Sequence, residues 1–406
     1  MRLSPTHAAI LAFAGTALFL TEQLMPTRTI GIVIDGATGR LGTTQHLRAL
    51  LAIAGEGGLA LANGDRLVPL PVLLGRNPDK LAALAERSGG LRWSTDRDAS
   101  LADPATEIYF DAGATGGRPE RARAAVAAGK HVYLEKPIAQ TLEDALSLAR
   151  AAERAGKKGG VVQDKLFLPG LKKLRRLYDA QFFGRVLSVR LEFGWWVFDG
   201  ELTPAQRPSW NYQKAGGGGL VLDMFAHWRY IFDRLLGPIT AVSCRHMTAL
   251  PTRRDEAGRP YDVDVEDHAF AIFELEGGAL AQIGASWANR VKRDDLLQIQ
   301  VDGTLGSAVA GLHRCFIQPS VATPRPAFSP EQPQSMVFDE QWQEMPELEP
   351  FENGYRAGWE LFLRHVAEDA PFPAPLLEGA KSVQLAEACY QSHRERRWVE
   401  LPALHL

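Results

Sequence analysis

The 406-residue sequence predicts an α/β fold with two main parts. The first is a Rossmann domain, a doubly wound parallel sheet, because apolar runs of buried-strand length alternate with helical segments up to residue 163. The second is a C-terminal α+β domain with a mostly antiparallel, open-faced sheet, because the strands after Gly184 alternate apolar and polar residues. We expect a helical extension over 1–27, the Rossmann domain over 28–163, and the α+β domain over 164–406.

Composition and charge point to a small-molecule partner. Hydrophobic residues make up 46% and charged residues 23% of the chain, which is ordinary for a globular protein. The net charge is -3 and no long basic run occurs, so we expect no nucleic acid partner. The cysteines, Cys244, Cys315 and Cys389, are far apart and odd in number, which predicts reduced thiols, a cytoplasmic location and no metal site.

The N-terminus contains an apolar run over 8–20 that resembles the hydrophobic region of a signal peptide. The run is too short to span a bilayer. Ser4, Pro5 and Thr6 form a helix start, and the helical pattern continues through Gln23 with no small-residue cleavage site. We therefore expect a retained helix packed on the protein body and no membrane partner.

A glycine-rich loop follows the first predicted strand. The strand covers 29–34, and a helical run covers 43–54. Strand, glycine turn and helix are the context in which glycines approach a pyrophosphate held at a helix N-terminus. The spacing is Gly-x-x-Gly-x-x-Gly, which departs from the usual Gly-x-Gly-x-x-Gly. The predicted cofactor contacts in this loop are Gly36, Thr38, Gly39, Arg40, Leu41 and Gly42.

The second strand, 68–74, follows a polar, glycine-rich insertion over 55–66 and ends in Gly75 and Arg76. Folds that select NAD usually place an acidic residue here, whereas an arginine accommodates the 2'-phosphate of NADP. We expect NAD or NADP, with NADP slightly favoured by Arg76, although a surface arginine is also common at this position.

Charged residues follow the next strands of the predicted parallel sheet. After a strand over 107–112 comes a loop with Thr115, and after a strand over 131–134 come Glu135, Lys136 and Pro137. Ligands bind outside the carboxyl ends of parallel strands, so these charges are placed to face one. The local pattern alone allows solvated loop charges equally well.

The second part of the chain carries a further polar pair. The last parallel strand is expected over 160–163, and the alternating strands at 185–193, 239–245, 268–275, 279–286, 296–301 and 307–310. Between the first two of these strands, a glycine run over 216–219 precedes a helix carrying Asp223 and His227. Residues four apart share one helical face. Glycines before the helix would let a ligand approach closely.

Taken together, the glycine loop, Glu135-Lys136-Pro137 and the Gly-Gly, Asp223, His227 pattern resemble the glucose-fructose oxidoreductase / inositol dehydrogenase / MocA superfamily, Gfo/Idh/MocA. The resemblance runs from about Arg28 to the C-terminus. It implies that Lys136 reaches the nicotinamide ribose and the reacting carbon, that His227 is the acid/base, and that Asp223 orients it or binds a hydroxyl. It also implies a homodimer or homotetramer formed through the open sheet face.

The resemblance extends to further residues. In the family, the loop after the 107–112 strand commonly reads Thr-Pro-Asn with a His shortly after, and here only Thr115 of that pattern is present. The resemblance therefore implies cofactor contacts from Thr115 in this loop, and from Glu135 and Lys136 after the next strand. Lys165 occupies a basic family position, as a substrate contact or equally as a salt bridge. Aromatic residues are frequent in the segment before the helix that carries Asp223 and His227, and they suit either a sugar pocket or the core. The expected substrate-binding residues are Lys136, Lys165, Trp210, Asp223 and His227.

These features predict an NAD(P)-dependent oxidoreductase acting on a secondary hydroxyl of a carbohydrate-like substrate, namely a sugar, sugar derivative or cyclitol. The imidazole of His227 has a pKa suited to accepting the hydroxyl proton. Two alternatives stay open: an NAD-dependent glycoside hydrolase that uses transient oxidation and elimination, and a protein that senses the nucleotide without chemistry. Net reduction of the cofactor separates the first two.

Overall fold

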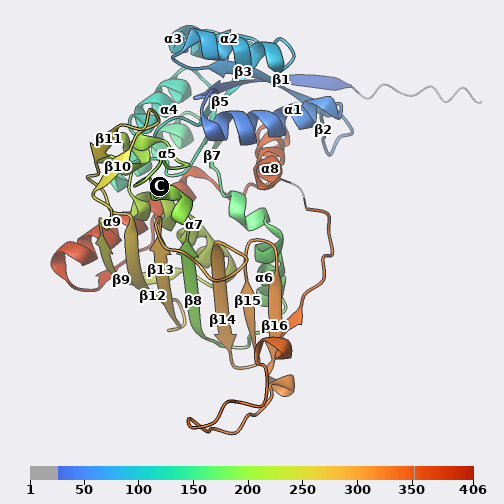
Figure 1. Ribbon diagram of the computed structural model, residues 1–406. Helices are drawn as coiled ribbons and strands as arrows, with labels where there is room; N and C mark the ends of the chain where they lie inside the picture. The colour runs from blue at the N-terminus through green and yellow to red at the C-terminus, as the bar shows by residue number, and fades with distance from the viewer. Residues whose placement is uncertain (1–25, 352) are drawn as a thin grey trace, which may run out of the picture.

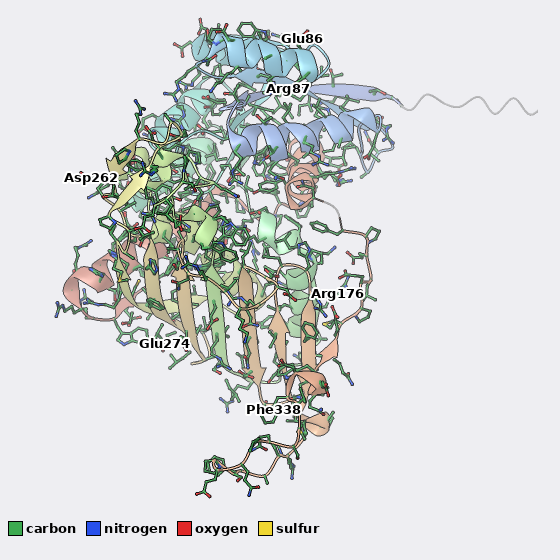
Figure 2. The ribbon with its side chains drawn as sticks, in the orientation of Figure 1. Glu86, Arg87, Arg176, Asp262, Glu274 and Phe338 are labelled. Atoms are coloured by element: carbon green, nitrogen blue, oxygen red, sulfur yellow. The ribbon has the colours of Figure 1, made fainter. Side chains whose placement is uncertain are left out.

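The computed structural model describes residues 26–351 and 353–406, so the expected N-terminal helix lies outside the described residues. Two sheets are arranged one beyond the other, with helix α7 (Leu220–Leu235) between them (Figure 1). Glu86, on α2 (Pro78–Arg87), lies at the far end of the first sheet's domain, and Phe338 at the far end of the second (Figure 2). The predicted combination of a parallel and a mostly antiparallel sheet is confirmed.

The first sheet is a Rossmann sheet. β1 lies at its centre, with β3 and β4 on one side and β5, β6 and β7 on the other, all parallel, while β2 pairs antiparallel with β3. This is the strand order of dinucleotide-binding folds. The strands are β1 (Thr27–Asp35), β2 (Leu59–Ala60), β3 (Arg66–Leu74), β4 (Trp93–Ser94), β5 (Thr106–Asp111), β6 (His131–Leu134) and β7 (Gly159–Val161).

The strands of the first sheet form where the sequence is continuously apolar, because helices cover both faces of this sheet. Ile30, Ile32, Val33 and Ile34 of β1 are fully buried. Local caps start the helices: the side chain of Asn77 accepts the N–H of Lys80 at α2. The other helices here are η1 (Gly42–Leu47), α1 (Arg48–Gly55), α3 (Arg97–Ala102), α4 (Arg118–Ala127) and α5 (Leu142–Arg154).

The second sheet has the order β17-β16-β15-β14-β8-β13-β12-β9-β18, and only the β8–β13 pair is parallel. Its strands are β8 (Val186–Gly194), β9 (Ile239–Met247), β12 (His268–Leu275), β13 (Leu280–Ser286), β14 (Leu297–Gly303), β15 (Gly306–Ala310), β16 (Cys315–Pro319), β17 (Gln343–Glu344) and β18 (Val399–Glu400). The alternating strands predicted from the sequence are present. The hairpin β10 (Thr252–Arg254) and β11 (Pro260–Asp262) was not predicted.

Helices cover one face of this sheet, and the other face is open. They are α6 (Pro169–Asp179), α7 and α9 (Leu376–Glu395); short helical turns are η2 (Asp164–Phe167), η3 (Trp196–Phe198), η4 (Ser209–Tyr212), η5 (Lys214–Gly216), η6 (Ser320–Ala322) and η7 (Asp339–Gln341). The open face exposes Phe270 and Ile272 of β12 and Leu280 of β13. No helix within the described ranges is both long and apolar enough to cross a membrane.

Packing does not follow the expected division after residue 163. That boundary marks the end of the first sheet, but α8 (Gly354–Glu368) returns to it, and its Trp359, Phe362 and Leu363 share one hydrophobic core with Ile32. The first half of α9 packs in the same way against the helices beside β6. The C-terminal helices therefore join the two halves, since α8 and the first half of α9 pack against the first domain while Ser382 of α9 also donates to the carbonyl of Ala226 on α7.

Candidate active site

The glycine loop after β1 is tightly folded. Gly36 has a φ of +78°, and a Cβ on Gly42 would lie 2.5 Å from the carbonyl oxygen of Gly36. Glycine is needed at both positions, the first for its backbone conformation and the second for the close approach of η1 to the loop. Thr38 and Leu41 are half-buried, and Arg40 is exposed. This loop is shaped for the close backbone approach that a pyrophosphate requires.

A hollow of about 580 Å³ lies beside the loop, at the ends of β1, β3 and β4. Arg76 is exposed at its rim, where the sequence placed it. Arg97, the first residue of α3, also lines it and pairs with the carboxylate of Asp35, Nε to Oδ2, at 2.9 Å. Arg97 was not predicted, although it follows β4 closely, as Arg76 follows β3. The loop and this hollow fit the adenosine and pyrophosphate end of a dinucleotide.

Glu135 is turned into the protein. Its Oε1 lies 2.8 Å from His46 Nε2, and its Oε2 accepts the backbone N–H of Lys136 at 3.1 Å. The indole of Trp359 can only donate, and it donates to His46 Nδ1 at 3.1 Å, so Nε2 of His46 carries the proton that Glu135 accepts. Burial alone would raise the pKa of Glu135, but His46 and Lys136 hold it below its ordinary value. Each carboxylate oxygen of Glu135 thus has a partner within the protein, and the predicted contact of Glu135 with the cofactor stays a prediction.

Lys136 meets Asp223 across the boundary between the two domains. Lys136 follows β6 and a cis bond joins it to Pro137, while Asp223 lies in the first turn of α7. Lys136 Nζ lies 2.7 Å from Asp223 Oδ1, and Arg207 Nη2 lies 2.5 Å from Oδ2 of the same carboxylate. Burial alone would raise the pKa of Asp223, but Arg207 and Lys136 together hold it well below its usual range. Asp223 is therefore a carboxylate clamped between two cations.

Arg207 was not predicted as part of the site. It lies in the irregular segment between η3 and η4, and its guanidinium carbon sits 4.9 Å from the ring centre of Phe198 and 4.7 Å from that of Trp287. The aromatic residues near it therefore hold a cation, an interaction that aromatic faces favour. No periodicity marks an arginine in such a segment, so the sequence carried no signal for it.

His227 is held by two residues that were not predicted, Tyr230 and Asp164. Its Nδ1 lies 2.6 Å from the hydroxyl oxygen of Tyr230, which lies 3.4 Å from Asp164 Oδ1. All three side chains are buried. Burial, followed by the charges of Lys165, Lys136 and Arg207, lowers the pKa of His227 well below its usual value. The imidazole is therefore neutral. The spacing of Tyr230, three residues after His227 on the same helix, was the available signal.

The structure also places the other predicted residues, Lys165, Trp210 and Thr115. Lys165 Nζ pairs with Asp164 Oδ2 at 3.3 Å, which is the salt bridge that the sequence left open. Trp210 is half-buried in η4. Thr115 is buried, and a Cβ on Gly217 would lie 2.8 Å from its Cβ. The predicted contacts of Thr115 with the cofactor and of Trp210 and Lys165 with substrate stay predictions.

The glycine run before α7 contacts protein rather than open space. A Cβ on Gly218 would lie 2.3 Å from the carbonyl oxygen of Asn211, and one on Gly219 would lie 2.8 Å from Glu266 Oε1. Glu266 accepts the N–H of Val221 at 2.8 Å and so fixes the start of α7. The sequence suggested that these glycines let a ligand approach closely. In the structure they let the chain pack closely around the start of the helix that carries Asp223 and His227.

Comparisons with known proteins identify the family. Residues 30–163 match the sequence model of the GFO/IDH/MocA oxidoreductase family with its NAD-binding Rossmann fold, and residues 171–309 match the GFO/IDH/MocA C-terminal domain. The D-xylose dehydrogenase of Paenarthrobacter nicotinovorans is 47% identical over 385 residues, which cover 94% of this chain and 99% of the relative. The levoglucosan dehydrogenase of Pseudarthrobacter phenanthrenivorans is 26% identical over 257 residues, covering 60% of this chain and 65% of the relative.

Solved structures agree in fold. A levoglucosan dehydrogenase in complex with NADH and L-sorbose superposes with a TM-score of 0.76 at 21% identity, covering 93% of this chain and all of the other. An oxidoreductase domain protein from Kribbella flavida gives 0.75 at 24% identity, covering 92% of this chain and all of the other. The predictions of an NAD(P)-dependent enzyme and of this architecture are confirmed. The chain belongs to the GFO/IDH/MocA family of NAD-binding oxidoreductases.

Proposed function

We propose that the protein oxidises a secondary hydroxyl of a pyranose sugar, with D-xylose as the first substrate to test, and that Lys136, Asp223 and His227 are its catalytic residues. The observation that carries the proposal is the contact between Lys136 Nζ and Asp223 Oδ1 at 2.7 Å. This contact links two parts of the site. One is the end of β6, where a nicotinamide is expected to bind, and the other is helix α7 of the second domain. The relative that is 47% identical along nearly the whole chain is a D-xylose dehydrogenase, which supports the choice of sugar.

The residues suit removal of a proton from a sugar hydroxyl. The nicotinamide ring, when bound, supplies the acceptor for the hydride of the same carbon. Lys136 donates hydrogen bonds from Nζ and can hold the reacting oxygen as its proton leaves. Asp223, kept ionised by its two cations, orients Lys136 and accepts from a sugar hydroxyl. His227 is neutral because it is buried, so its Nε2 can accept the hydroxyl proton.

Tyr230 and Asp164 give the proton on His227 an onward path. The Tyr230 hydroxyl contacts both His227 Nδ1 and Asp164 Oδ1, and it has one proton to donate. When it donates to Asp164, it accepts from Nδ1–H and leaves Nε2 free to act as a base. When it donates to Nδ1, Nε2 carries the proton and acts as an acid in the reverse direction. The same three residues can therefore serve oxidation and reduction.

The test is direct. Purified protein is incubated with D-xylose and either NAD or NADP, and the nicotinamide absorbance and the sugar products are followed together. The oxidoreductase reading predicts one reduced nicotinamide for each sugar oxidised. The hydrolase alternative predicts glycoside cleavage with no net reduction, and the sensor alternative predicts dinucleotide binding without turnover.

His227→Ala is the matching variant. Loss of a general base lowers turnover by roughly 10²- to 10⁴-fold. Affinity for the reduced dinucleotide, measured by its fluorescence, should stay near that of the wild type. Undiminished turnover in this variant would remove His227 from the mechanism.

We also propose that the open sheet face forms the interface of a homodimer. Phe270, Ile272 and Leu280 lie exposed on neighbouring strands, with Phe270 at 55% exposure. Clustered apolar residues of this kind on an otherwise folded surface mark protein interfaces. A symmetric dimer would bury the same strands of both copies against each other.

A cytoplasmic location is part of this proposal. Cys244, Cys315 and Cys389 are buried and unbridged. Free thiols persist in a reducing compartment.

A further inference from the structure

Gln163 is a buried amide with nothing to bond to. Its side chain is 4% exposed, and neither Nε2 nor Oε1 has a hydrogen-bond partner among residues 26–351 and 353–406. An amide buried without partners destabilises a fold, because its donors and acceptor lose their bonds to water. A polar group kept at such a position calls for a partner from outside the chain.

The pattern at Gln163 differs from that of other buried polar atoms. Gln384 also has an unpartnered Oε1, but its Nε2 donates to the carbonyl of Pro402 at 2.7 Å. Gln163 is the residue in the described ranges for which two buried side-chain polar atoms both lack partners. An accidental packing fault would leave one atom unpaired more readily than an entire amide.

The position of Gln163 places it within the site. It follows β7, whose register pairs Leu134 with Val161, and the next N–H, that of Val162, donates to Leu134 at 2.9 Å. Gln163 therefore lies at the same strand-end edge as Lys136, one strand along. The residue after it, Asp164, has its Oδ1 3.9 Å from His227 Nδ1. Gln163 thus lies between Lys136, at the neighbouring strand end, and Asp164, which is close to His227.

We propose that the Gln163 amide binds the sugar substrate, donating from Nε2 to one hydroxyl and accepting at Oε1 from another. The inference rests on the proposed function and adds a residue that selects the substrate. A neutral amide matches the donor and acceptor character of vicinal hydroxyls on a sugar ring. The charged groups nearby, Lys136 and Asp223, already serve the reacting hydroxyl, so Gln163 recognises hydroxyls that do not react.

The carboxamide of nicotinamide also has one acceptor and a donor group, so it could pair with Gln163 as well. The experiment therefore has to distinguish sugar hydroxyls from nicotinamide as the partner of Gln163. Gln163→Leu removes both polar atoms at nearly constant size. Three quantities are measured: kcat/KM for D-xylose and its monodeoxy derivatives, the Kd of NADH and NADPH from nicotinamide fluorescence without sugar, and Tm of the cofactor-free protein. The control is Gln384→Leu, which removes a buried glutamine whose amide bonds within the protein.

A site that holds hydroxyls rejects analogues lacking them, because its polar groups are then left unpaired. We expect kcat/KM for D-xylose to fall roughly 10- to 100-fold in Gln163→Leu, with the dinucleotide Kd within twofold of the wild type. The loss should shrink to about threefold or less for the deoxy sugar that lacks the contacted hydroxyl. Tm should be unchanged or higher, because an unpaired amide is replaced by an apolar group. Gln384→Leu should lower Tm and leave kcat/KM nearly unchanged.

Three results would overturn the proposal: a loss of less than threefold for D-xylose, an equal loss for every deoxy sugar, or a parallel loss of dinucleotide affinity, which would assign the amide to nicotinamide. Failure of the proposed function looks different, because then the wild-type protein itself oxidises none of these sugars.

Discussion

Replacing Tyr230 with Phe tests the path from His227 to Asp164. The variant removes only the hydroxyl that lies 2.6 Å from His227 Nδ1. Without it, the nearest Asp164 oxygen is 3.9 Å from Nδ1, beyond hydrogen-bond range, although the charge of Asp164 still attracts an imidazolium across that distance. The loss is therefore one buried hydrogen bond, and leaving its partner unpaired costs about 1–3 kcal/mol. If the whole cost falls on the transition state, kcat falls roughly 5- to 150-fold.

The pH profile distinguishes this role from simple packing. In the wild type, burial lowers the pKa of His227 and nearby cations lower it further, so the base is already neutral near pH 6.5 and the acid limb of kcat/KM lies below that. The lost bond supports the protonated imidazole, so its removal lowers this pKa further. The acid limb of Tyr230→Phe should therefore move to lower pH while the plateau falls.

Tyr390→Phe is the matched control, because it removes another tyrosine hydroxyl that donates to a buried carboxylate, Glu266 Oε1, at 3.0 Å. It should cost a similar amount of stability and leave the position of the acid limb unchanged. The relay is refuted if Tyr230→Phe keeps its rate within threefold of the wild type, or if its acid limb moves to higher pH.

The cofactor and the interface give two further predictions. Arg76→Ala should weaken NADP binding by about tenfold or more and NAD binding much less, since charge-assisted bonds to a phosphate are strong; equal losses in fluorescence titrations would remove the phosphate argument. Phe270→Lys should shift the assembly measured by light scattering from dimer towards the 44.5 kDa monomer, whereas Phe338→Lys, at an exposed phenylalanine away from the open face, should not; a monomeric wild type would contradict the interface.

The fold was predictable where the sequence repeats a pattern. β12 covers His268–Leu275, the range that alternation predicted, because one face of this strand is buried and the other is open. α8 escaped prediction because its partners are distant in the chain: Trp359 is buried beside residues of β1 and β5. Amphipathic pattern shows that a face must be buried, but it does not show against which sheet.

The site was predictable to the level of its motifs. Lys136, Asp223 and His227 carry signatures in residue type and spacing, and the contact of Lys136 with Asp223 joins two of them. Motifs do not give side-chain direction, which is why Glu135 was expected to face a ligand and instead faces His46. Residues such as Arg207 act through a contact formed only after folding, so no local pattern identifies them.

The buried pair of Glu135 and His46 gives the acidic residue beside Lys136 a structural role. His46 belongs to η1, the helix that begins at Gly42 of the glycine loop, and its proton is fixed on Nε2 by Trp359. Glu135 binds that proton with one oxygen and the N–H of Lys136 with the other. Because a buried carboxylate is costly unless both oxygens are satisfied, the pair holds only when the loop helix and the strand end are correctly placed relative to each other. The helix of the glycine loop and the backbone of Lys136 are therefore held by one shared side chain, that of Glu135.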